Sequence, residues 1–153
     1  MLQTNGTLLT EAFCEFLSEN DFLVGLSIDG PQELHDCYRL TLKEEPTWEN
    51  VMNGLKCLHK YKVQFNTLTV VNDINSQNPL EVYRFLKDIG SQFMQFIPIA
   101  ERYAKNPGEE DIHLVHHEFP GETQVTSWSV KPARYGQFLI SIFEEWVRED
   151  VGR

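Results

Sequence analysis

The sequence predicts an α/β protein whose parallel strands end at a ligand-binding crevice. In the run 22–28, one face of the strand is wholly apolar, whereas the other turns polar only at its carboxyl end, at Ser27, with Asp29 just beyond it. A parallel strand has this pattern when helices cover its outer face and its inner face opens onto a site. The same pattern recurs at 63–72 and 93–98, and helical patterns separate these runs.

Each predicted helix has recognisable start or stop signals. Thr10 has the side chain of a helix N-cap, Asn78 followed by Pro79 is a favourable helix start, and Gly90 ends that helix. The expected strands lie at 22–28, 63–71 and 92–98, with only the last turn of a strand at 2–6, and the expected helices lie at 10–20, 34–38, 47–60, 78–90 and 133–150. Helical crossovers between strands imply right-handed βαβ units and a parallel sheet.

Composition narrows the class of protein. A chain of 153 residues with 41% hydrophobic residues suits one packed domain. The net charge of −10 repels phosphate backbones, so we expect no nucleic-acid partner. No run of about 18 apolar residues occurs, so we expect no membrane partner. Three widely spaced cysteines fit neither a disulfide framework nor a zinc site, which predicts reduced and mostly buried thiols in a cytoplasmic protein.

The two ends of the sequence are also informative. Residues 2–3 leave no room for a full strand before the turn at 4–6, and the sequence stops where the helix at 133–150 has just ended. We therefore expect the chain to be a piece of a longer protein.

Several short motifs occur together in a characteristic order. They are Gln3-Thr4-Asn5-Gly6, Ser27-Ile28-Asp29-Gly30-Pro31, His35-Asp36-Cys37-Tyr38-Arg39, Asn66-Thr67-Leu68-Thr69-Val70-Val71-Asn72 and Gln95-Phe96-Ile97-Pro98. This series resembles the middle of the radical S-adenosylmethionine enzymes, and most closely the anaerobic sulfatase-maturating enzymes. The resemblance implies that residues 1–153 are an incomplete portion of a parallel, TIM-like partial (β/α)6 barrel, with an irregular inserted segment at about 101–131.

The resemblance also implies an activity. In that family a [4Fe–4S] cluster splits S-adenosylmethionine into methionine and a 5′-deoxyadenosyl radical, which takes a hydrogen from a Cys or Ser of a sulfatase and leads to formylglycine. The family's Cys-x3-Cys-x2-Cys motif is absent here. We therefore expect the cluster ligands and the catalytic acid or base to lie outside this chain, which then has no catalytic or metal-binding residue and is inactive alone.

Ser27 and Arg39 are the leading candidates for cofactor contacts. By resemblance both bind S-adenosylmethionine: a hydroxyl donates to a carboxylate or binds a ribose oxygen, and a guanidinium gives the methionyl carboxylate a bidentate partner. From the residues alone, Ser27 could instead bind its neighbouring backbone, and Arg39 could be a surface arginine paired with Asp36. By resemblance, Ala100 touches the adenosine end.

Other polar residues near the strand ends have two interpretations. Gln3, Asn5 and Asn66 either line the cavity and bind cofactor or substrate peptide, or connect adjacent strand ends. Asp29 is expected to form an Asx turn before Gly30.

A histidine-rich stretch and an aromatic stripe have plain structural interpretations. The metal-binding residue types of the first are Asp111, His113, His116, His117 and Glu118. Their spacing fits no standard metal site, so we expect none there. The aromatic residues Phe138, Phe143 and Trp146 recur at helical spacing and are expected in the core.

Two further functions remain open at this point. The chain could belong to a radical maturase of another peptide substrate. It could also be a non-catalytic, regulatory half-barrel that binds sulfatases.

Overall fold

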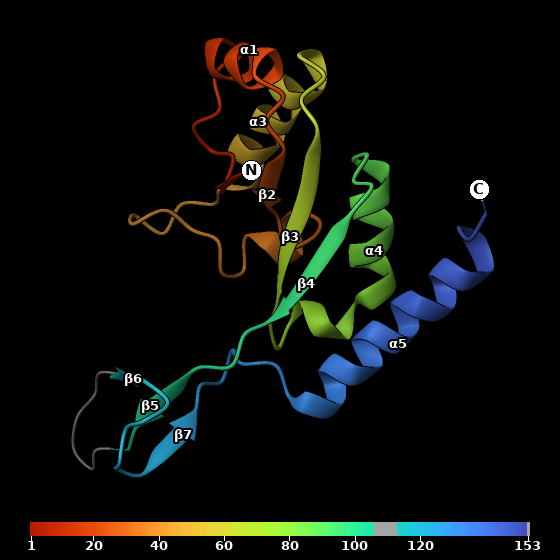
Figure 1. Ribbon diagram of the computed structural model, residues 1–153. Coiled ribbons are helices and arrows are strands. Elements are labelled where there is room, and N and C mark those ends of the chain that lie inside the picture. Colours follow the sequence, from red (N-terminus) through yellow and green to blue (C-terminus); the bar gives the residue numbers. More distant parts are fainter. Residues whose placement is uncertain (106–112, 153) are drawn as a thin grey trace.

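Four parallel strands form the centre of the computed structural model, which describes residues 1–105 and 113–152 (Figure 1). They are β1 (Leu2–Thr4), β2 (Val24–Ser27), β3 (Phe65–Val71) and β4 (Met94–Pro98). Their order in the sheet is β1-β2-β3-β4, the order in which they occur in the chain. Helical crossovers join the strands, so the predicted α/β class and parallel sheet are confirmed.

The helices begin and end close to the predicted residues. They are α1 (Glu11–Glu19), α2 (Gln32–His35), α3 (Trp48–Lys60), α4 (Pro79–Asp88) and α5 (Pro132–Glu149), with a 3₁₀ turn at Asn75–Gln77. The Thr10 hydroxyl accepts a hydrogen bond from the Phe13 N–H at 3.3 Å, which confirms it as the cap of α1. Pro79 is the first residue of α4, where its missing N–H costs nothing.

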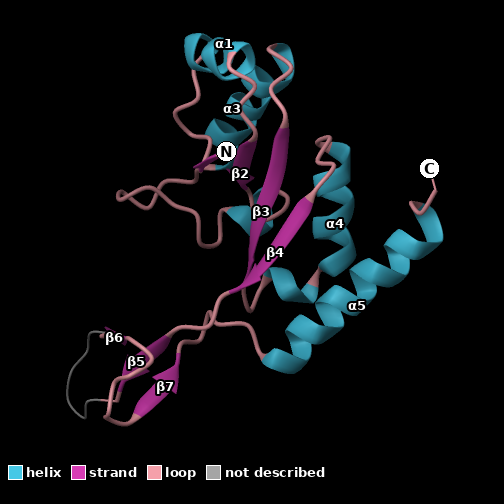
Figure 2. Cartoon of the chain, in the orientation of Figure 1, coloured by secondary structure: helices cyan, strands magenta, loops and turns pink. Residues whose placement is uncertain are grey.

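The two faces of the sheet differ in burial. On β2 the side chains of Val24 and Leu26 are fully buried, and Ile28 continues that face just beyond the strand. On β3, Thr67, Thr69 and Val71 are buried, whereas the residues between them are only half-buried. The helices pack on the buried face, with α1 and α3 towards β2 and with α4 and α5 beyond β4 (Figure 2). Along the opposite, inner face of the sheet, Ser27, Asn66 and Leu68 are only half-buried.

Gly54 lets helix α3 approach the loop that follows β1. A Cβ at this position would lie 2.2 Å from the carbonyl oxygen of Gly6, far closer than any side chain tolerates. The loop 5–9 is thus held directly against the helix backbone. This contact holds Gly6, the residue that follows Asn5, against α3.

A small antiparallel sheet interrupts the connection between β4 and α5. Its strands are β5 (Arg102–Ala104), β6 (Leu114–Val115) and β7 (Thr123–Val125), in the order β6-β5-β7. The sequence predicted an irregular segment at 101–131, because these strands are too short to give a clear alternation. The sheet projects away from the main body (Figure 1).

Some details differ from the sequence-based expectations. β1 is a short strand paired with β2, although the sequence showed room only for a strand end. Phe138 is fully buried as predicted, but Phe143 and Trp146 are 59% and 45% exposed, because only one side of α5 packs on the sheet and on α4. Of the thiols only Cys14 is fully buried, while Cys37 is exposed. In the described residues no helix is long and apolar enough to span a bilayer.

Candidate functional site

The four parallel strands end at one edge of the sheet. Asn5 follows β1, Ser27 ends β2, Asn72 follows β3 and Ala100 lies just after β4. Because parallel strands end at the same edge of a sheet, these residues border one mouth. Loops there carry the side chains that can bind a ligand, while the sheet holds them in place.

An ion pair between Asp29 and Arg39 is the centre of this edge. The Arg39 Nε donates to Asp29 Oδ2 at 2.6 Å, and its Nη2 donates to Oδ1 at 3.1 Å. The Asp29 side chain is 4% exposed and that of Arg39 is 24% exposed. Asp29 Oδ1 also accepts from the Val70 N–H at 2.8 Å, which ties the pair to β3. The guanidinium is therefore anchored while part of it faces solvent.

This pairing differs from one alternative that the sequence left open and from one expectation. Asp36 does not pair with Arg39, because its Oδ1 accepts from the backbone N–H groups of Thr47 and Trp48 at the start of α3. Nor does Asp29 form an Asx turn, because its carboxylate is directed to Arg39 and Val70. The Asp29 carboxylate thus binds Arg39, ten residues further along the chain, instead of the backbone of its own turn.

A buried histidine completes the network around Arg39. The His35 Nδ1 accepts from the Asp29 N–H at 3.2 Å, which places the proton of the neutral ring on Nε2, 3.2 Å from Thr47 Oγ1. The Thr47 hydroxyl donates in turn to the Arg39 carbonyl at 2.6 Å. Burial lowers the pKa of His35, which favours this neutral form. Asp29, His35, Thr47 and Arg39 thus form a closed cycle of hydrogen bonds.

The turn after β2 is fixed by two further residues. Gly30 has φ +127°, a conformation that side chains rarely adopt, so the chain can reverse directly after Asp29. The buried Asn75 Nδ2 donates to the carbonyls of Asp29 and Val70 at 3.2 and 2.8 Å. The ends of β2 and β3 are therefore held together by one side chain.

A cleft of about 240 Å³ opens beside Arg39. Asn5, Thr7 and Tyr38 line it together with Arg39, so the structure brings two of the predicted site residues, Asn5 and Arg39, to one cavity. Ser27 is the last residue of β2, two residues before Asp29, and within the described residues its half-buried hydroxyl has no hydrogen-bonding partner. The edge thus offers two sets of unused donors, a guanidinium edge and a hydroxyl, which suit a carboxylate.

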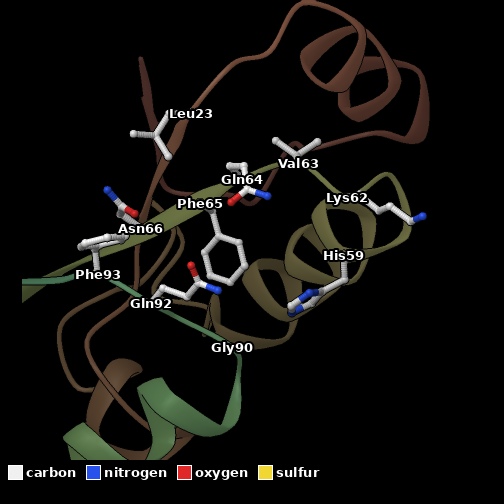
Figure 3. A pocket seen from close by; sticks show the side chains of 10 residues that line it. All are labelled: Leu23, His59, Lys62, Val63, Gln64, Phe65, Asn66, Gly90, Gln92 and Phe93. Carbon is white, nitrogen blue, oxygen red and sulfur yellow. The ribbon is translucent and has the colours of Figure 1, made fainter. Parts of the chain in front are cut away.

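The remaining predicted site residues lie elsewhere on the sheet. Gln3 and Asn66 each pair in register with Gly25, so they share a row on the inner face, nearer the amino ends of the strands than Ser27. Asn66 lines a different cleft of about 520 Å³ at those amino ends (Figure 3). Ala100 is exposed beyond β4. The structure therefore does not bring Asn66 to the cleft of Arg39.

The histidine-rich stretch is only partly described. His113, His116, His117 and Glu118 are described, whereas Asp111 lies outside the described residues. The closest polar pair there is His117 Nε2 and Glu118 Oε1 at 3.7 Å, both highly exposed. In the described part of the chain, no group of three or more His, Cys, Asp or Glu side chains could hold a metal ion.

Sequence reasoning missed the roles of His35, Thr47 and Asn75. The sequence indicates only a short helix around His35 and a helix start at Thr47. The available signal was their spacing: His35 follows Asp29 by six residues and precedes Arg39 by four, so a tight loop could bring all three together. No local pattern marks Asn75.

Comparison with known proteins gives a consistent result. No protein-family model matches the chain. It is 46% identical over 152 residues to a serine-type anaerobic sulfatase-maturating enzyme of Bacteroides thetaiotaomicron, a match that covers 99% of this chain and 36% of the relative. It is 35% identical over 148 residues to a cysteine-type enzyme of Clostridium novyi, covering 97% of this chain and 35% of the relative.

The fold agrees with the sequence comparison. A solved structure of native anSMEcpe with bound AdoMet and the Cp18Cys peptide superposes with a TM-score of 0.79 and 35% identity, over 96% of this chain and 36% of that one. A parallel β/α sheet with this match defines part of a partial TIM-like barrel of the radical S-adenosylmethionine class. More specifically, the chain belongs with the anaerobic sulfatase-maturating enzymes. It spans about a third of the length of the relatives it matches.

Proposed function

We propose that this chain is the part of a radical S-adenosylmethionine maturase that binds the methionyl end of the cofactor, in an enzyme that converts a Cys or Ser of a sulfatase to formylglycine. The observation that carries the proposal is the anchored Arg39 at the carboxyl edge of the sheet, the edge at which Ser27 ends β2. The similarity to sulfatase-maturating enzymes, one with AdoMet and a peptide bound, supports the choice of ligand.

The donor set fits the carboxylate of an amino acid. Asp29 occupies Nε and one hydrogen of Nη2, so three of the five guanidinium hydrogens have no partner in the described part of the chain and remain for a ligand. Ser27, at the end of β2, supplies a further donor. Asn5 lines the same cleft as Arg39, and in this proposal Ala100 touches the adenosine end of the cofactor. Gln3 and Asn66 share a row on the inner face that lies nearer the amino ends of the strands. When bound, S-adenosylmethionine supplies the hydrogen-abstracting radical.

The residues present do not fit the iron–sulfur cluster. Cys14 is buried between α1 and α3 next to Cys57, whereas Cys37 is exposed beside α2, where its Sγ donates to the Glu33 carbonyl at 3.0 Å. We therefore derive no step of the reaction through these cysteines. In this proposal residues 1–153 form one portion of the barrel domain, inactive alone, and act in the cytoplasm on a sulfatase polypeptide.

Cofactor binding is the direct test. In the complete polypeptide encoded by the gene, reconstituted anaerobically without reductant, Arg39→Ala should weaken S-adenosylmethionine binding by about 1.5–3 kcal/mol, because a charge-assisted contact is lost. Ser27→Ala should cost about 1 kcal/mol. Titration calorimetry measures both changes. Arg84→Ala, which removes an exposed arginine paired with Glu145, is the matched control and should leave affinity unchanged.

The reaction itself is tested by mass spectrometry of a sulfatase-derived peptide. With wild-type protein the target residue should become formylglycine, and Arg39→Ala should require more cofactor for the same rate. Wild-type affinity in both Ser27→Ala and Arg39→Ala would refute the assignment of this edge.

A further inference from the structure

We propose that Asp29 is a positioning residue for Arg39, which orients the guanidinium for the carboxylate of the cofactor. The proposal rests on the proposed function of this edge, and it names the residue that orients Arg39 before the cofactor binds. Asp29 itself touches no ligand in this arrangement, because its side chain is 4% exposed and both of its oxygens are used within the protein.

The geometry of the ion pair supports this role. Asp29 holds Arg39 by the Nε and Nη2 edge, so the guanidinium plane is fixed, and Nη1 has no hydrogen-bonding partner among residues 1–105 and 113–152. An arginine has about 2 kcal/mol of rotamer entropy to lose when it is ordered. Here the ordering has already occurred during folding, so a ligand need not supply it.

The backbone of Arg39 is fixed as well. Its carbonyl accepts from the Thr47 hydroxyl, which His35 holds from the other side, and His35 accepts from the Asp29 N–H. The cycle therefore returns to the residue that binds the guanidinium. These hydrogen bonds therefore hold both the main chain and the side chain of Arg39 in one orientation.

The same ion pair permits an opposite effect. Asp29 is an anion close to where a second carboxylate would bind, so it could also compete with the ligand for Arg39. Orientation and competition predict opposite changes when the negative charge of Asp29 is removed. The two effects are therefore separable by one substitution.

Asp29→Asn is the informative variant. It keeps an oxygen for the Val70 N–H and replaces the other by an NH₂ group, which cannot accept from Arg39. In the complete reconstituted polypeptide without reductant, orientation by Asp29 predicts that S-adenosylmethionine binds roughly three- to tenfold more weakly, the cost of ordering one long side chain. Unchanged or tighter binding would overturn the proposal, because Asp29 would then be neutral or competing.

A double variant tests whether the effect passes through Arg39. If it does, Asp29→Asn should cause no further loss of affinity in an Arg39→Ala background. An equal loss in both backgrounds would overturn the proposal. Glu145→Gln is the matched control, because Glu145 is also a buried carboxylate bonded to arginines, Arg84 and Arg148, but lies between α4 and α5. Its melting temperature should fall while cofactor affinity stays the same.

Arg39→Lys provides a second test if Asp29→Asn does not fold. A lysine keeps the positive charge but cannot form the two-pronged pair, so it should bind the cofactor almost as weakly as Arg39→Ala. Wild-type affinity of Arg39→Lys would overturn the proposal. If Arg39→Ala binds normally, the proposed cofactor site fails together with this inference, whereas a normal Asp29→Asn beside a weakened Arg39→Ala overturns the inference alone.

Discussion

Substituting Gly54, with Gly136 as a control in another helix, tests how closely α3 is packed against the loop after β1. In Gly54→Ala the new Cβ would lie 2.2 Å from the Gly6 carbonyl oxygen, whereas ordinary contacts begin at 3.4 Å. Helix and loop must therefore separate by more than about 1 Å, and overpacking of this kind costs roughly 1–3 kcal/mol. Alanine gains back about 0.5–1 kcal/mol as a better helix former. The free energy of unfolding should fall by about 1–2 kcal/mol.

Gly136→Ala is the matched control for this prediction. Gly136 also lies inside a helix, α5, but a Cβ there meets nothing within 4 Å. Only the gain in helix propensity remains, so the free energy of unfolding should rise by roughly 0.5–1 kcal/mol. Urea unfolding followed by circular dichroism measures both variants. If Gly54→Ala is as stable as Gly136→Ala, the close approach of α3 to Gly6 is wrong.

Three further outcomes follow from burial and titration. Burial lowers the pKa of His35, so as the pH falls the imidazole is protonated in the unfolded chain before it is protonated in the folded one. The free energy of unfolding should therefore fall as the pH drops below about 6.5. Urea unfolding at several pH values should show a shallower fall for His35→Gln. Phe138→Ala should cost about 3–5 kcal/mol, and the exposed Phe143→Ala less than about 0.5 kcal/mol; equal losses would contradict the packing of α5. Dithionitrobenzoate at neutral pH should label the exposed Cys37 rapidly. Burial raises the pKa of Cys14 to about 11, so Cys14 should be labelled only when the protein unfolds. Fast labelling of Cys14 would show that its contact with α3 opens.

The fold was predictable because its main signals are local. The apolar face of Val24 and Leu26, the Thr10 cap and the Asn78-Pro79 helix start each fix an element within a few residues of sequence. The strands of the small sheet escaped prediction because two or three residues give no measurable alternation. The exposure of Phe143 and Trp146 depends on what packs against α5, which helical periodicity alone does not specify.

The candidate site was predictable in part for the same reason. Ser27, Asn5 and Arg39 were predicted to lie near one mouth because they stand at strand ends or in the loops that follow, and Asn5 and Arg39 do line one cleft. Asn66 was placed in the same group because its motif runs along β3, but five residues separate it from the end of that strand, so it lies at the opposite edge. The partner of Arg39 was missed because a long-range ion pair has no sequence periodicity.

The small sheet between β4 and α5 leaves and rejoins the main body at almost one point. Backbone hydrogen bonds from Val130 to Ile99 and from Asp73 to Trp128, at 3.1 Å each, fasten its base beside the end of β3. Since the entropy of closing a loop grows only slowly with its length, residues can be added or removed beyond that base at little cost in stability. The base therefore marks a junction where evolution, or a protein engineer, can exchange whole segments while the four-stranded sheet keeps its register.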